Sequence, residues 1–93
     1  SKKIPPLIRR LKLPEQHYVA QAREIARLVQ NTALKHCKAD LVAGCCVYIT
    51  IRRNSRIIPL SDVAQHLSVD LHTLGRLYTR ILTPLGVALS DVD

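Results

Sequence analysis

The stretch LVAGCCVYITI, residues 41–51, decides the fold because it is apolar or small at every position. A helix that packs on one side only carries polar residues on its other side, and this segment carries no charged residue on any side. We therefore predict a central helix from Ala39 to about Arg53 that is buried all round. Gly44 and its small neighbours would let other helices approach it closely. The β-branched residues near the end of the stretch are also compatible with a strand.

Two helices are predicted before this central one. The first runs from Ile4 to Leu13, with two prolines in its first turn, where they are tolerated, and Pro14 after its end. The second runs from about Glu15 to Leu34. It is predicted from apolar residues that recur at helical spacing, namely Tyr18, Ala22, Ile25, Ala26, Val29 and Ala33.

Two further helices are predicted after the central one. Pro59 suits the first position of the fourth helix, which ends near Leu67. Residues 68–69 form a break, and Asp70 is a suitable N-cap for the fifth helix. The fifth helix has an apolar inner face, made by Leu71, Leu74, Leu77, Tyr78, Ile81 and Leu82, and Pro84 and Gly86 are expected to end it. The predicted fold is thus all-α, with five helices, a buried third helix, and a helix-turn-helix formed by the fourth and fifth.

The charge balance points to a polyanionic partner. The chain has 93 residues, enough for one domain, and 14 Lys plus Arg against 7 Asp plus Glu give a net charge of +7. An excess of this sign favours nucleic acid or an acidic protein surface. Much of it falls in residues 2–12, in residues 52–56, and at Arg76 and Arg80. We expect the arginines to share one face of the folded domain.

Several classes of function are excluded by the same composition. The three cysteines are an odd number, and Cys45 and Cys46 are adjacent, so a disulfide framework is not expected. No Cys-x2-Cys or His-x3-His spacing is present, so we expect no metal and no cofactor. No nucleophile motif or phosphate loop is present, so the protein is not expected to be an enzyme or to take a small-molecule substrate. The longest uncharged stretch, residues 41–51, is too short to cross a membrane.

Three segments together resemble the cyclin-type repeat of the transcription factor IIB family (TFIIB). They are Tyr48-Ile49-Thr50-Ile51-Arg52, then Ser61-Asp62-Val63-Ala64, and then Leu74-Gly75-Arg76. In that family the central helix typically closes with Tyr-Ile-Ala-Cys-Arg, and the fifth helix of the first repeat carries Ile-Gly-Arg. Residues 11–14, Leu-Lys-Leu-Pro, resemble the family's Leu-x-Leu-Pro between the first two helices. The similarity spans Ile4 to Leu85 and is closer to a first repeat than to a second.

The resemblance implies a domain of a basal transcription factor. Its partners would be promoter DNA, the TATA-binding protein, and RNA polymerase II or III, and its location the nucleus, or the cytoplasm of an archaeon. The segments at residues 67–70, 74–75 and 85–87 resemble the Brf branch, which serves polymerase III. Family members usually carry a zinc ribbon and two repeats, so residues 1–93 are expected to be a single repeat cut from a longer chain. The second repeat of the family reads DNA with a Val and an Arg, whose places are taken here by His72 and Gly75, so that base reading is not expected.

The candidate contact residues fall into three sets. They are Arg52, Arg53 and Arg56 after the central helix; His72, Thr73, Arg76 and Arg80 on the fifth helix; and Lys2, Lys3, Arg9 and Arg10 at the start of the chain. Arginines suit bidentate contact with phosphate or carboxylate, and a helix-turn-helix could present its second helix to a DNA groove. Each set is also compatible with an ordinary solvated surface. Two alternative functions remain open, a cyclin-fold module that binds acidic proteins without direct DNA binding, and an autonomous helix-turn-helix regulator that dimerises.

Overall fold

The computed structural model describes residues 2–89, and this part of the chain contains five α-helices, one short 3₁₀ helix and no strand. The elements in chain order are α1 (Ile4–Arg10), α2 (Glu15–Val29), η1 (Ala33–His36), α3 (Ala39–Arg53), α4 (Leu60–Leu67) and α5 (Leu71–Leu89). The all-α prediction is therefore confirmed. None of the described helices is both long and apolar enough to span a membrane.

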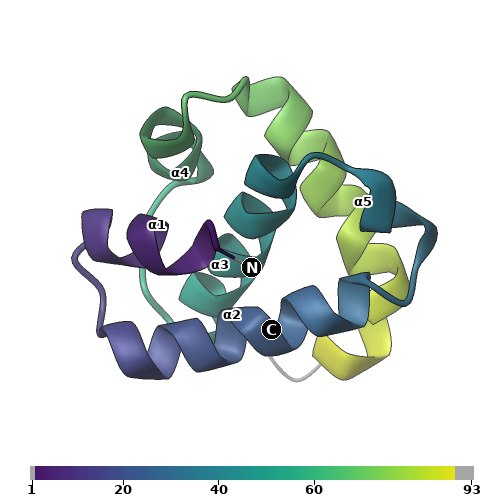
Figure 1. The fold of residues 1–93 in the computed structure, drawn as a ribbon, viewed down its shortest axis with the longest axis horizontal. Coiled ribbons are helices and arrows are strands. Elements are labelled where there is room, and N and C mark those ends of the chain that lie inside the picture. Colours follow the sequence, from purple (N-terminus) through teal and green to yellow (C-terminus); the bar gives the residue numbers. More distant parts are fainter. Residues whose placement is uncertain (1, 90–93) are drawn as a thin grey trace.

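Helix α3 is the centre of the domain, with the other helices arranged around it (Figure 1). It contacts α1, α2, α4 and α5. Residues 43–47 and 49–51 of α3 are buried, which covers all sides of the helix. The predicted central helix has the predicted bounds, and the alternative of a strand is wrong. Burial from every side explains why a segment with many β-branched residues remains helical, since tertiary contacts override a weak propensity.

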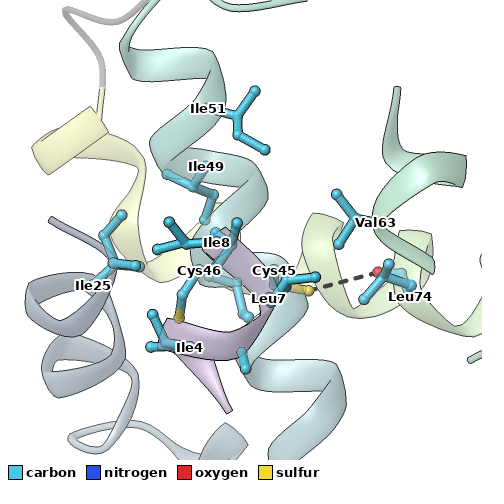
Figure 2. Packing of buried hydrophobic residues seen from close by; sticks show 14 of the residues in the cluster. Ile4, Leu7, Ile8, Ile25, Cys45, Cys46, Ile49, Ile51, Val63 and Leu74 are labelled. Atoms are coloured by element: carbon cyan, nitrogen blue, oxygen red, sulfur yellow. Dashed lines mark hydrogen bonds between the residues drawn. The ribbon is translucent and has the colours of Figure 1, made fainter. Parts of the chain in front are cut away.

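In the part of the chain that the structure describes, every buried side-chain nitrogen or oxygen atom has a hydrogen-bond partner. Figure 2 shows Ile4, Leu7 and Ile8 of α1 packed against the cysteines of α3. The Cys45 thiol donates to the carbonyl oxygen of Leu74 at 3.7 Å, which connects α3 to α5. Burial raises the pKa of both Cys45 and Cys46 to about 12, so both thiols remain protonated at neutral pH. They serve as small apolar side chains.

Gly44 sets how closely α4 and α5 approach α3. A Cβ atom placed on Gly44 would lie 2.7 Å from Leu67 Cδ1 and 3.1 Å from Leu74 Cδ1. Both distances are shorter than an ordinary carbon-carbon contact of about 3.5–4.0 Å. The space beside Gly44 is therefore filled by side chains of the two helices that follow it.

Three predicted helix ends differ from the structure. Helix α2 ends at Val29 rather than Leu34, because the Thr32 hydroxyl donates to Val29 O at 2.7 Å and accepts from Leu34 N at 3.1 Å, which turns the chain into η1. Helix α1 ends at Arg10 rather than Leu13, and Lys12 adopts a φ of 59° in the turn that follows. Helix α5 continues to Leu89 instead of ending near Pro84 and Gly86. The fixed φ of proline is itself helical, so proline removes a hydrogen bond without necessarily ending the helix.

Candidate nucleic-acid and partner interface

The corner between α4 and α5 is built by local hydrogen bonds. Ser68 adopts a left-handed conformation (φ 55°, ψ 42°) that ends α4, and Val69 N donates to Ala64 O at 3.0 Å. Asp70 Oδ2 accepts from Thr73 N at 2.8 Å and from the Thr73 hydroxyl at 3.0 Å. The hydrogen bond from the Thr73 backbone holds the pKa of Asp70 below its usual value. The predicted N-cap is confirmed, and the hydroxyl of Thr73, a candidate contact residue, is already engaged in this cap.

The outer face of α5 carries exposed cations beside an apolar hollow. His72, Arg76 and Arg80 follow one another at a spacing of four residues, so they lie on one side of the helix. The hollow has a volume of about 580 Å³ and is lined by Leu60, Leu71, His72, Gly75, Arg76, Thr79 and Arg80. Among the residues that the structure describes, no carboxylate lies within ion-pair distance of Arg76 or Arg80. These guanidinium groups are available to an acidic partner.

Two arginines, one in the last turn of α3 and one just after it, lie over aromatic rings of two different helices. The Arg52 guanidinium lies 6.0 Å from the ring centre of Tyr48, and that of Arg56 lies 6.0 Å from the ring centre of Tyr18 on α2. Asn54 fixes the turn, because its side-chain amide donates to Gln21 Oε1 at 3.0 Å and to Thr50 O at 2.8 Å. Arg53 is exposed and forms no ion pair with any described carboxylate. The end of α3 and the turn after it thus form a cationic corner, which Asn54 connects to α2.

The basic residues at the start of the chain divide between two places. Lys2, Lys3 and Arg10 line a hollow of about 520 Å³ that also includes Asp40 and His66. Lys3 pairs with Asp40 at 3.3 Å, and Arg10 donates to the carbonyl oxygen of His66 at 3.1 Å. Arg9 is not part of this hollow and instead pairs with Glu15 at 2.7 Å. Part of the positive charge in this set is therefore already compensated.

The expectation that the arginines share one face is wrong. Helices α1 and α5 lie on opposite sides of α3 (Figure 1), so Arg9 and Arg10 are separated from Arg76 and Arg80. Wrapping the other helices around a buried α3 distributes their exposed sides around the domain. The predicted sets on α1 and on α5 consequently lie on different sides of the domain.

Sequence reasoning missed the apolar part of the α5 surface. Leu71 was expected on the inner face of the fifth helix, but 47% of it is exposed, and Leu60 and Gly75 were not considered as site residues. The hollow depends on α4 packing beside α5, and no local pattern in the sequence specifies this. In the described part of the chain, no group of His, Cys, Asp or Glu side chains is placed to hold a metal ion.

The comparisons agree with the architecture. The family model described as transcription factor TFIIB repeat matches residues 1–83. No curated protein and no solved structure matches the chain. The match covers all of α1 to α4 and most of α5, so it includes every candidate contact residue. The chain therefore belongs to the TFIIB repeat family, a non-enzymatic family of transcription factors, and has its all-α, cyclin-like fold.

Proposed function

We propose that this repeat binds promoter DNA together with the TATA-binding protein and helps to recruit RNA polymerase. The observation that carries the proposal is the cationic corner at the end of α3, where Arg53 and Arg56 are exposed and have no carboxylate partner among the described residues. Membership of a transcription factor family makes DNA the expected polyanion. The proposed place of action is the nucleus, or the cytoplasm if the chain is archaeal.

The physical basis of this binding is the neutralisation of phosphates. Each arginine that contacts a phosphate releases condensed counterions, so affinity falls as salt rises. A corner with two or three such contacts gives only weak binding to DNA alone. A partner that already bends the duplex would bring more of the backbone within reach of the cations and raise the affinity. Lys2, Lys3 and Arg10 are proposed as a second, weaker phosphate contact, because Lys3 already has a carboxylate neighbour.

A gel-shift titration with a TATA-containing duplex tests the proposal. We expect weak, salt-sensitive binding by the chain alone and tighter binding when the TATA-binding protein is present. Changing Arg53→Glu and Arg56→Glu together should lower the salt slope of log affinity by about 2, roughly 1 for each lost phosphate contact.

The matched control carries Arg23→Glu and Arg27→Glu, which produce the same change in net charge on the exposed side of α2. This control loses only the exposed pair between Arg27 and Glu24, so its fold should be intact. If adding the TATA-binding protein produced no gain in affinity, or if both double variants weakened binding equally, the proposed role would be contradicted.

One alternative function is favoured by a specific observation. The apolar hollow beside Arg76 and Arg80 is the kind of surface that a protein-interaction module presents, and it is separate from the corner after α3.

A further inference from the structure

The hollow of about 520 Å³ near the start of the chain, called the α1–α4 hollow below, is formed by three helices. Its lining residues come from α1 and the residues before it, from the first turn of α3, and from the end of α4. Lys2, Lys3 and Arg10 bring three cations to it, and Asp40 contributes a carboxylate that pairs with Lys3 at 3.3 Å. No described carboxylate lies within ion-pair distance of Lys2 or Arg10. The lining residues therefore leave an excess of positive charge in the hollow.

Ser68 lines the same hollow and has a hydroxyl that the fold does not use. It ends α4 with a φ of 55°, in the left-handed region where glycine is the usual residue and a Cβ atom is strained. The residue is exposed, and its hydroxyl has no hydrogen-bond partner among the residues that the structure describes. Neither the backbone conformation nor the packing explains a serine at this position.

Arg10 of α1 brings its guanidinium group to the segment that contains Ser68. It donates to the carbonyl oxygen of His66, two residues before Ser68, at 3.1 Å. A guanidinium group has five N–H donors, so this bond leaves donors for a second acceptor. The carboxylate of Asp70, two residues after Ser68, is engaged elsewhere, because it accepts two hydrogen bonds from Thr73 of α5. An anionic group on Ser68 would therefore have a cation beside it.

We propose that Ser68 is a phosphorylation site and that the α1–α4 hollow holds the phosphate. The hydroxyl oxygen of Ser68 attacks the γ-phosphorus of a nucleoside triphosphate bound to a protein kinase. The Oγ–P bond forms, the bond from the γ-phosphorus to the oxygen that bridges it to the β-phosphate breaks, and nucleoside diphosphate leaves. The hydroxyl proton passes to a base of the kinase. The product carries a charge of about −2 and three acceptor oxygens, which suit contact with Lys2 and Arg10.

Phosphorylation would change the charge of this side of the domain. A phosphate of about −2 offsets most of the positive charge that Lys2, Lys3 and Arg10 bring to the hollow. These three residues are the second phosphate contact with DNA proposed above, so a phosphate on Ser68 would occupy them from within the chain. This consequence for DNA binding rests on the proposed function, whereas the capture of the phosphate by the hollow does not.

Phosphoserine incorporated at position 68 during synthesis of the chain tests this capture. At low salt, circular dichroism should show a melting temperature about 4–8 °C higher than that of the unphosphorylated chain, the shift expected for one net charge-assisted contact in a domain of this size. When both chains also carry Lys2→Ala and Arg10→Ala, phosphorylation should no longer raise the melting temperature. A melting temperature that phosphorylation leaves unchanged or lowers, or a gain that survives these two changes, would overturn the inference.

The matched control carries phosphoserine at position 55. Ser55 is also exposed and has a similar left-handed conformation, with a φ of 57°, but it does not line the α1–α4 hollow. Any effect of its phosphate on the melting temperature should be the same with and without Lys2→Ala and Arg10→Ala. An equal dependence of both phosphates on Lys2 and Arg10 would show general attraction between charges and would contradict a specific site at Ser68.

A labelling experiment tests whether Ser68 is a kinase substrate. The folded chain is incubated with an extract of the cells it comes from and with a nucleoside triphosphate that is radiolabelled in its γ-phosphate. The chain should take up label, and Ser68→Gly should remove most of it. Glycine suits a φ of 55°, so this variant should melt at or above the temperature of the original chain. Absence of label, or equal label in the variant, would overturn the inference.

The gel-shift assay separates this inference from the proposed function. Phosphorylation of Ser68 should lower the salt slope of log affinity for the TATA-containing duplex by about 1–2, for one or two lost phosphate contacts. Failure of the unphosphorylated chain to bind the duplex would contradict the proposed function and leave the melting and labelling results in force. Binding with a salt slope that phosphorylation does not change would overturn the consequence for DNA while the proposed function stands.

Discussion

Two glycines in two helices differ in the space beside their Cα atoms. Gly44 lies in the packed interior of the domain, and Gly75 lies at its surface. At Gly44 in α3, an added Cβ would lie 2.7 Å from Leu67, so the neighbouring helices already occupy the space. At Gly75 in α5, an added Cβ would meet only Leu60, at 3.8 Å. The first glycine allows close helix packing, whereas the second leaves an open hollow beside two arginines.

The comparison extends to the helices that carry these glycines. The middle of α3 is buried on every side, and the hydroxyl of its buried Thr50 donates to Cys46 O at 2.9 Å within the helix. Helix α5 buries Leu74, Leu77 and Ile81 and presents cations to solvent. We infer that stability resides mainly in α3 and its contacts, and recognition in exposed positions that the packing does not need. The following predictions test this division, from the largest expected effect to the smallest.

The largest difference is expected in the reactivity of the cysteines. Alkylation requires the thiolate, and burial raises the pKa of Cys45 and Cys46 to about 12, compared with about 8.5 for a free thiol. At pH 8 both should react about 1,000-fold more slowly in the folded chain than in the denatured chain, and partly exposed Cys37 should be the residue that is labelled. Mass spectrometry after timed exposure to iodoacetamide would measure this. Labelling of Cys45 and Cys46 at the denatured rate would show that α3 is not buried as described.

One buried and one half-exposed leucine of α5 provide the next test. Leu74 is fully buried against α3, so Leu74→Ala should lower the free energy of unfolding by about 3 kcal/mol. Leu71→Ala on the exposed side should cost much less, because nearly half of that residue is already in solvent. Urea denaturation of both variants would measure the difference. Similar losses for the two would contradict the assignment of an inner and an outer face.

An aromatic pair joins α3 to α5 and should make a smaller contribution. The rings of Tyr48 and Tyr78 are 5.0 Å apart and meet edge to face. Such a pair is worth about 1 kcal/mol beyond its burial. A double-mutant cycle with Tyr48→Leu and Tyr78→Leu should give a coupling energy of that size, and additive effects would show that the pair does not contribute as a unit.

The smallest effect is expected at the exposed cap of α5. The hydrogen bond from Thr73 N lowers the pKa of Asp70 in the folded chain below the unfolded value of about 3.9. The ionised carboxylate therefore stabilises the folded chain at pH values above the unfolded pKa. This stabilisation is lost as the pH falls through the folded pKa. Asp70→Asn retains a capping oxygen without this titration. The melting temperature of the unmodified chain should exceed that of the variant at pH 7, and the gap should close in acid. A gap that stayed constant from pH 7 to pH 2 would contradict this role.

Much of the fold could be predicted because a few residues constrain it strongly. Residues 41–51 are apolar or small at every position, and a helix of this kind is covered on all sides only at the centre of the domain. The bounds predicted for α3 therefore match those of the structure. Asp70 was identified because N-capping depends on local chemistry. The end of α2 was missed because Thr32 forms a turn through its own hydroxyl, which a pattern of apolar spacing does not register.

The surfaces were less predictable because they depend on how helices are placed. The candidate cations were identified from charge, but the separation of those on α1 from those on α5 follows from the arrangement of these helices around α3. The hollow over Gly75 depends on Leu60, which is 15 positions earlier in the sequence and belongs to another helix. The sequence identifies Gly75 only as part of a family motif and as a mismatch to a base-reading arginine.

The free energies of unfolding of Gly44→Ala and Gly75→Ala, measured by urea denaturation, test the central comparison most directly. The added methyl group gains helix propensity at both positions, worth about 1 kcal/mol, but at Gly44 it also collides with Leu67 and Leu74, at a cost of about 1–3 kcal/mol. We predict that Gly75→Ala unfolds at higher urea than the unmodified chain and that Gly44→Ala unfolds at lower urea. Equal stability of the two variants, or a loss at Gly75 as large as that at Gly44, would contradict the division between a packed interior and an open outer face.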